Sequence, residues 1–249
     1  MTISLRARGV RAVVLDVEGT TTPIAFVNDT LFPYAREHLR EFLREHFGSA
    51  VIEEPVRLLR DEWEEDVARD ENPPAWRDVD RDDSLDCIAA YVLWLMHRDR
   101  KSPGLKLLQG QIWERGYRDG SLRGDVFDDV PRALERWRAD GIVVAVYSSG
   151  SVLAQRLLFS TTTFGDLTSH IAAHFDTGVG SKRDAASYAR IADALGVGSS
   201  ACLFVSDIDA ELEAASSAGW QVVLCLRPGD STDIGSGRDV IATFDEITS

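Results

Sequence analysis

The chain has 249 residues, of which 44% are hydrophobic, so it can bury a substantial core and suits one large domain or two unequal ones. Its formal net charge of −14 at pH 7 disfavours binding to nucleic acid and to anionic membrane surfaces. No apolar stretch approaches the roughly 20 residues that a membrane-spanning helix needs, and we identify no signal peptide. A small anionic substrate can still bind where local positive charge overrides the global field.

The chain contains three cysteines, and their spacing is not typical of a metal site. Cys202 and Cys225 lie inside apolar, strand-like runs, and the third is Cys87. We therefore expect reduced, buried thiols in a protein of the cytoplasm.

Four short apolar runs rich in β-branched residues predict buried strands, at residues 11–15, 141–147, 201–205 and 221–226. Strands of a parallel sheet are apolar along their whole length because helices cover both faces of the sheet. Segments with helical periodicity lie between the later runs. This alternation predicts an α/β fold with a doubly wound, Rossmann-like parallel sheet.

Residues 23–125 differ from the rest of the chain because they show helical periodicity without a strong β-run. They follow the first predicted strand directly. We therefore expect an inserted helical domain at 23–125 and an α/β core made of residues 1–22 and 126–249.

Two predicted helices of the core begin beside polar residues that can bind an anion. One begins near Ser151. The other has Ser181 as a plausible N-cap and Gly196 as a plausible C-terminal stop. This assignment puts Lys182 in the first helical turn, where its ammonium and the positive helix end could both meet an anion.

The first predicted strand ends at Asp16, and in an open α/β sheet the carboxyl ends of the strands face the ligand crevice. Glu18 follows two residues later, and Gly19 permits a sharp turn. One carboxyl group could serve as a nucleophile and the other as a general acid and base. A single Asp after a strand is usually only a polar residue that ends the strand. Whether Asp16 is a functional residue therefore depends on which residues follow the other predicted strands.

Further chemical groups are expected at the same sheet edge. Ser148 and Ser149 offer hydroxyl and backbone N–H groups to a phosphate oxygen, and Lys182 offers a cation. Asp207 follows a predicted strand, with Asp209 and Glu211 close behind it, and carboxylate oxygens there suit a hard cation such as Mg²⁺. Together with Asp16, these residues supply the groups that a metal-assisted phosphoryl transfer needs.

The order of these groups resembles the four motifs of the haloacid dehalogenase superfamily of phosphohydrolases, and the helical insertion resembles the cap domain of that superfamily. Most of its phosphatases have a second Asp where this chain has Glu18, so the acid here is longer by a methylene group. The motifs match Asp16-Val17-Glu18-Gly19-Thr20, Ser148 or Ser149, Lys182, and Ser206-Asp207.

Within the superfamily, the segments DVEGTTTPI, VYSSGSVLAQRLLF and DRKSPGLKLLQGQIWERGY resemble the enolase-phosphatases, also called acireductone synthases, of methionine salvage. The resemblance runs from about residue 10 to residue 227. It implies an enzyme that enolises 2,3-diketo-5-methylthiopentyl-1-phosphate and then releases phosphate, through an aspartyl-phosphate, to give acireductone (1,2-dihydroxy-3-keto-5-methylthiopentene).

The resemblance also implies Mg²⁺ as the cofactor and assigns roles to the motif residues. Asp16 would attack phosphorus, and Glu18 would act as acid and base. The metal would be held by Asp16, by Glu18 through its backbone carbonyl, and by Asp207. The substrate-binding residues would be Ser148, Ser149 and Lys182.

Several assignments stay open at the level of sequence. The sequence does not identify the enolisation base, and Glu18 and residues of the helical insertion are candidates. Phe26, Trp94 and Trp113 could contact the apolar methylthio tail, although packing inside the insertion explains each of them as well. His170 and His174, four residues apart, lack a third ligand that would make a metal site.

Two other functions are compatible with the motifs. One is a phosphatase of the same superfamily for another small phosphoester, such as phosphoserine or phosphoglycolate. The other is a non-catalytic phospho-acceptor module, which leaves the large insertion and Glu18 unexplained. For the enzyme we expect a monomer whose insertion opens and closes over a small phosphorylated substrate, without nucleic-acid or membrane partners.

Overall fold

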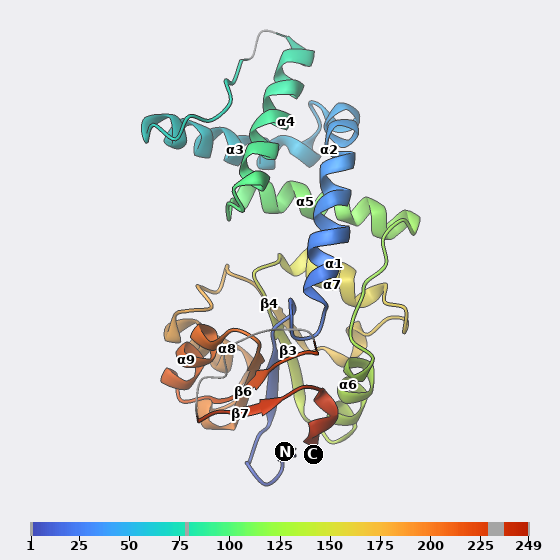
Figure 1. The fold of residues 1–249 in the computed structure, drawn as a ribbon, viewed down its shortest axis with the longest axis vertical. Coiled ribbons are helices and arrows are strands. Elements are labelled where there is room, and N and C mark those ends of the chain that lie inside the picture. Colours follow the sequence, from blue (N-terminus) through green and yellow to red (C-terminus); the bar gives the residue numbers. More distant parts are fainter. Residues whose placement is uncertain (1, 78–79, 229–236, 249) are drawn as a thin grey trace. The chain divides into compact units, whose positions relative to one another are not determined.

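A computed structural model describes residues 2–77, 80–228 and 237–248. The chain divides into two compact units, one of residues 1–27 with 123–249 and one of residues 28–122. The sequence predicts these two boundaries between residues 22 and 23 and between residues 125 and 126. The two units are drawn in Figure 1 and are described separately below.

The first unit is built on a six-stranded sheet in the order β4-β3-β2-β5-β6-β7, and all of its strand pairs are parallel. Helices α8 and α9 lie on one side of this sheet and α6 on the other (Figure 1). The predicted doubly wound parallel sheet is therefore confirmed. The strands are β2 (Ala12–Leu15), β3 (Val143–Tyr147), β4 (Ala173–Phe175), β5 (Cys202–Ser206), β6 (Gln221–Cys225) and β7 (Asp239–Ile241).

The central strands form because their side chains are apolar on both faces. All four residues of β2 and all five of β5 are buried. Around them, Tyr147, Tyr188, Phe204 and Trp220 pack their rings against one another in one hydrophobic cluster. Burial of such large rings contributes strongly to the stability of the core. This well-packed core lies directly beneath the strand ends that carry the polar residues.

The helices of this unit are α6 (Asp129–Ala139), α7 (Val152–Ser160), α8 (Ala185–Leu195) and α9 (Asp209–Ser217). Helix α7 begins as predicted, because the Ser151 side chain accepts a hydrogen bond from the backbone N–H of Ala154 at 3.2 Å. Gly196 ends α8 with a φ of +65°, also as predicted.

The predicted start of α8 is wrong. Its N-cap is Asp184, whose side chain accepts a hydrogen bond from Ala186 N at 3.0 Å, and Ser181 belongs to the turn before it. Both residue types cap helices, and Asp184 is the one in the capping position. Lys182 therefore lies in a turn that precedes α8, and not in the first helical turn as predicted.

The second unit is helical throughout its regular part, which follows from the absence of strong β-runs in its sequence. Gly104 in α5 allows close packing on α3, since a Cβ atom there would lie 2.8 Å from the Pro55 carbonyl oxygen. Asp66 is fully buried and is satisfied by Tyr91 and Arg100. The helices are α2 (Phe32–His46), α3 (Ala50–Ala68), α4 (Arg81–His97) and α5 (Pro103–Asp119).

The remaining elements are short. None of the helices in the described part of the chain is long and apolar enough to cross a membrane. The short elements are β1 (Ile3–Ser4) paired in parallel with β8 (Ile247–Thr248), α1 (Ile24–Phe26), a π-helical turn (Val27–Leu31), and 3₁₀ turns at Thr168–His170, Ser199–Ala201 and Phe244–Glu246.

Candidate active site

Asp16 directly follows β2 at the carboxyl edge of the sheet and is only 4% exposed. Its backbone N–H donates to the Val205 carbonyl oxygen at 2.9 Å, which extends the pairing of β2 with β5. Its Oδ1 atom accepts a hydrogen bond from Val17 N at 2.7 Å, and its Oδ2 atom accepts one from Ser206 Oγ at 3.1 Å. The carboxylate is thus held in one orientation by both of its oxygens.

Lys182 lies between two carboxylates. Its Nζ atom is 2.6 Å from Asp16 Oδ1 and 2.6 Å from Glu211 Oε2, and the side chain is 6% exposed. Burial by itself would lower the pKa of Lys182, but the two carboxylates outweigh it and raise the pKa. The lysine is therefore a buried ammonium that neutralises part of the negative charge of the site.

Glu211, in the first turn of α9, completes this group. From the sequence it is a carboxyl group close behind Asp207 that suits a hard cation, whereas in the structure its Oε2 atom pairs with Lys182. Its Oε2 atom also lies 3.2 Å from Ser206 Oγ, so Asp16 and Glu211 share the single proton of that hydroxyl. Burial and the nearby Asp16 raise the pKa of Glu211, against the opposing effect of Lys182. The available signal was its position in the sequence, since Glu211 lies four residues after Asp207, in the first turn of the helix that follows β5.

Asp207 follows β5, and its backbone N–H donates to Thr20 Oγ1 at 3.1 Å. Its Oδ1 atom is buried and has no hydrogen-bond partner among the described residues. Burial and the charge of Asp16 raise the pKa of Asp207 to about 7. A buried carboxylate oxygen without a partner, beside a second carboxylate, is a good ligand for a hard cation.

Gly19 makes this approach of Asp207 possible. Its φ of +76° belongs to the left-handed region, and a Cβ atom at this position would lie 2.3 Å from Asp207 Oδ2. Within the turn, the Val17 carbonyl oxygen accepts backbone hydrogen bonds from Thr21 and Thr22, each at 2.9 Å. The turn is therefore compact, and a glycine is required at its tightest point.

Glu18 lies in this turn with an exposed side chain, and its backbone forms an isolated bridge with Thr22. Its carboxyl group is thus not part of the buried group around Lys182. Its predicted roles, as acid and base and as a metal ligand through its carbonyl, stay predictions.

Ser148 and Ser149 follow β3, the strand next to β2. Ser148 is buried, its backbone N–H donates to the Phe175 carbonyl oxygen at 3.1 Å, and its Oγ atom accepts from Gly150 N at 3.0 Å. Ser149 is half-buried. Both residues are at the sheet edge that carries Asp16, while their part in substrate binding stays a prediction.

The three aromatic residues that could contact the methylthio tail each pack against other parts of the protein. Trp113 is buried, and its indole N–H donates to the Leu31 carbonyl oxygen at 2.8 Å; Trp94 is half-buried and stacks on Tyr91. Phe26 is buried in α1. These contacts are those of ordinary packing, and nothing in them assigns the aromatic rings to a substrate.

His170 and His174 are four residues apart but do not lie on one helix, so their spacing does not bring them together on one helical face. His170 lies in a 3₁₀ turn and His174 in β4, and burial lowers the pKa of His174 to about 4. No group of three or more His, Cys, Asp or Glu side chains within residues 2–77, 80–228 and 237–248 is arranged as a metal site. A cation near Asp16 and Asp207 would thus need a further ligand, such as a main-chain carbonyl.

Comparison with known proteins adds independent information. A family model described as haloacid dehalogenase-like hydrolase matches residues 10–219. The chain is 47% identical over 241 residues to the enolase-phosphatase E1 of Synechococcus elongatus, covering 96% of this chain and 98% of that protein. It is 45% identical over 242 residues to the probable bifunctional methylthioribulose-1-phosphate dehydratase/enolase-phosphatase E1 of Oryza sativa subsp. indica, covering 94% of this chain and 46% of that protein.

Among solved structures, the UTR4 protein of Saccharomyces cerevisiae is similar, with a TM-score of 0.74 and 32% sequence identity. The match covers 93% of this chain and 97% of that chain. The likeness therefore extends through both the sheet unit and the helical unit.

Proposed function

The chain belongs to the haloacid dehalogenase-like hydrolases and, among them, to the enolase-phosphatases, and on this premise we propose that it converts 2,3-diketo-5-methylthiopentyl-1-phosphate to acireductone and phosphate in methionine salvage. The observation that carries the phosphatase chemistry is the buried contact of Asp16 with Lys182 and of Lys182 with Glu211. The family similarity, rather than the buried contact, selects this substrate.

The phosphoryl transfer follows from how the side chains are held. Ser206 and Val17 N fix the carboxylate of Asp16, and Lys182 offsets its charge so that a phosphate dianion can approach. Asp16 attacks phosphorus, and the bond from phosphorus to the substrate oxygen breaks. Glu18 gives that oxygen a proton.

The second half of the transfer releases phosphate. Glu18 removes a proton from a water molecule, which attacks the phosphorus of the aspartyl-phosphate. Asp16 is regenerated as a carboxylate, and Lys182 again pairs with it. Ser148 and the backbone near Ser149 are proposed to hold the phosphate oxygens during both halves.

The preceding enolisation removes a proton from a carbon atom next to a carbonyl group. Glu18 and residues of the 28–122 unit are the candidates for the base. The ammonium of Lys182 can stabilise the negative charge that develops on the enolate oxygen.

We also propose that the enzyme uses Mg²⁺. Asp16, Asp207 and the backbone carbonyl of Glu18 would hold it, and the buried Asp207 Oδ1 without a described partner supports this assignment. When bound, the ion supplies positive charge that relieves the repulsion between a carboxylate and a phosphate group.

The test supplies the diketo phosphate to the purified protein with Mg²⁺ or with EDTA, and follows the enol absorbance and free phosphate in the same reaction. We expect both signals with Mg²⁺, loss of phosphate release with EDTA, and recovery when Mg²⁺ is restored. Phosphoserine and phosphoglycolate serve as comparison substrates. A higher kcat/KM for either would contradict the proposal, and stable phosphorylation without turnover would favour a phospho-acceptor module.

We further propose that the enzyme acts as a cytoplasmic monomer on this small substrate, without nucleic-acid or membrane partners. Cys87, Cys202 and Cys225 are all buried, which agrees with the buried, reduced thiols expected of a cytoplasmic protein. Light scattering of the purified protein should give the mass of a single chain.

A further inference from the structure

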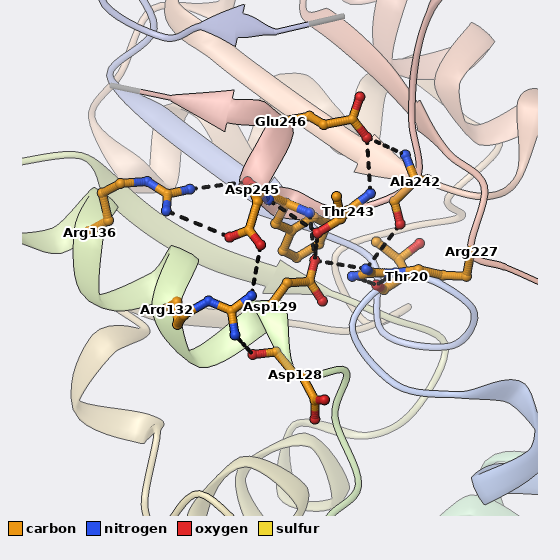
Figure 2. A network of polar contacts seen from close by, with 11 residues as sticks. Thr20, Asp128, Asp129, Arg132, Arg136, Arg227, Ala242, Thr243, Asp245 and Glu246 are labelled. Atoms are coloured by element: carbon orange, nitrogen blue, oxygen red, sulfur yellow. Dashed lines mark hydrogen bonds and ion pairs between the residues drawn. The ribbon is translucent and has the colours of Figure 1, made fainter.

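A buried arginine outside the motif residues is tied to the turn that follows Asp16. Arg227 lies two residues after β6 and is 4% exposed. Its Nε and Nη2 atoms both donate to one acceptor, the carbonyl oxygen of Thr20, at 2.9 and 2.7 Å (Figure 2). Two N–H groups of one rigid guanidinium restrict the direction in which this carbonyl can point.

The guanidinium is also held from its other sides. Its Nη1 atom donates to Asp129 Oδ2 at 2.8 Å and to the Ala242 carbonyl oxygen at 3.3 Å. The centroids of the Phe127 and Phe244 rings lie 4.2 and 4.7 Å from Cζ, the central carbon of the guanidinium. A lysine ammonium cannot reproduce the planar fork and the two ring contacts together.

Asp129, at the start of α6, is the anionic partner of this arginine. Its Oδ2 atom also accepts hydrogen bonds from Thr243 Oγ1 at 2.9 Å and from Phe244 N at 2.5 Å (Figure 2). Burial would raise the pKa of Asp129, but these hydrogen bonds and Arg227 lower it. The carboxylate therefore stays charged and fixes where Nη1 of Arg227 lies.

Thr20 links this buried pair to the site. Its carbonyl accepts from Arg227, while its hydroxyl accepts from the backbone N–H of Asp207 at 3.1 Å. Its own N–H donates to the Val17 carbonyl oxygen at 3.3 Å, within the turn that follows Asp16. A tilt of the Thr20 peptide would thus move the attachment of Asp207 relative to Asp16.

We propose that Arg227 is a positioning residue that fixes the carboxylates of Asp16 and Asp207 relative to each other through Thr20, with Asp129 orienting its guanidinium. This inference rests on the proposed function, because it concerns the same phosphoryl-transfer site. Among the described residues, its guanidinium contacts Thr20, Asp129, Ala242 and the two phenylalanine rings, so we infer that it acts through the turn. Small displacements of reacting groups lower rates by up to about 10²-fold.

The test compares Arg227→Gln and Arg227→Lys with Arg132→Gln as a matched control. Arg132 belongs to the same network in Figure 2, but its side chain is 58% exposed, and its guanidinium donates to the Asp128 carbonyl oxygen and to the Asp245 carboxylate. For each variant we would measure kcat, KM, the melting temperature and, without substrate, the affinity for Mg²⁺ by calorimetry.

We expect Arg227→Gln to lower kcat by about 10- to 100-fold and to weaken Mg²⁺ binding by about tenfold, with KM changed less than about threefold. Arg227→Lys keeps a positive charge beside Asp129, so it should recover most of the melting temperature while kcat stays low. Arg132→Gln should match the unaltered protein in kcat and in Mg²⁺ affinity.

Recovery of kcat together with the melting temperature in Arg227→Lys would overturn the inference, because Arg227 would then only balance the charge of Asp129. Unchanged kcat and Mg²⁺ affinity in both Arg227 variants would overturn it as well. If the unaltered protein does not turn over the diketo phosphate, the proposed function fails, while the Mg²⁺ titration without substrate still decides the role of Arg227.

Discussion

Asp16→Asn is expected to lower the rate of phosphate release by about 10⁴-fold or more while the protein still folds. The amide is not a nucleophile toward phosphorus, but it has the shape of the carboxylate. Its oxygen can still accept hydrogen bonds from Val17 N and Lys182, and its NH₂ group can donate to Ser206 Oγ. The large effect should therefore fall on chemistry rather than on folding.

The measurement is phosphate release by Asp16→Asn under saturating substrate, with the melting temperature as the check on folding. Asp209→Asn is a matched control, because Asp209 is an exposed Asp in the first turn of α9 whose side chain pairs with Arg238. If enolisation precedes phosphoryl transfer, the enol absorbance should still rise in Asp16→Asn as enol-phosphate accumulates. Turnover close to that of the unaltered enzyme would contradict the assignment of Asp16.

Lys182→Met is expected to lower kcat by about 10³-fold and to lower the free energy of unfolding by about 3 kcal/mol. The first effect follows from loss of the cation that faces the nucleophile and the phosphate. The second follows because Asp16 and Glu211 would face each other without the ammonium that now lies 2.6 Å from both. Denaturant titration and steady-state kinetics measure the two effects separately.

The double variant Lys182→Met with Glu211→Gln separates the two roles of the lysine. Removing both charges should restore most of the unfolding free energy, because the two carboxylates no longer repel each other, while kcat stays low. Arg183→Gln, an exposed cation in the same turn, serves as the control. Recovery of kcat in the double variant would show that Lys182 has only a structural role.

The strands that could be predicted from sequence are those with the strongest local signal. β2, β3, β5 and β6 are apolar runs of four or five residues near the middle of the sheet. The edge strands β4 and β7 have only three residues each and are mostly half-buried. They become strands because a neighbour offers hydrogen bonds, and no pattern within three residues indicates that pairing.

The site was predictable where a residue follows a strand, and less so where its role depends on another segment. Asp16 and Asp207 could be identified as site residues from the sequence because each lies just after a predicted strand, at the carboxyl edge of the sheet. Glu211 acquires its role from Lys182, which precedes a different helix. Arg227 acquires its role from Thr20, 207 residues earlier, so its position after the apolar run 221–226 was the only local signal.

Trapping the phosphorylated side chain tests most directly that Asp16 is the nucleophile. The enzyme would be mixed with substrate and Mg²⁺, quenched during turnover and treated with borohydride, which reduces a phosphorylated aspartate to homoserine. Peptide mass spectrometry should then find homoserine at position 16, only when substrate is present and never in Asp16→Asn. Turnover without this modification, or homoserine at another position, would contradict the mechanism.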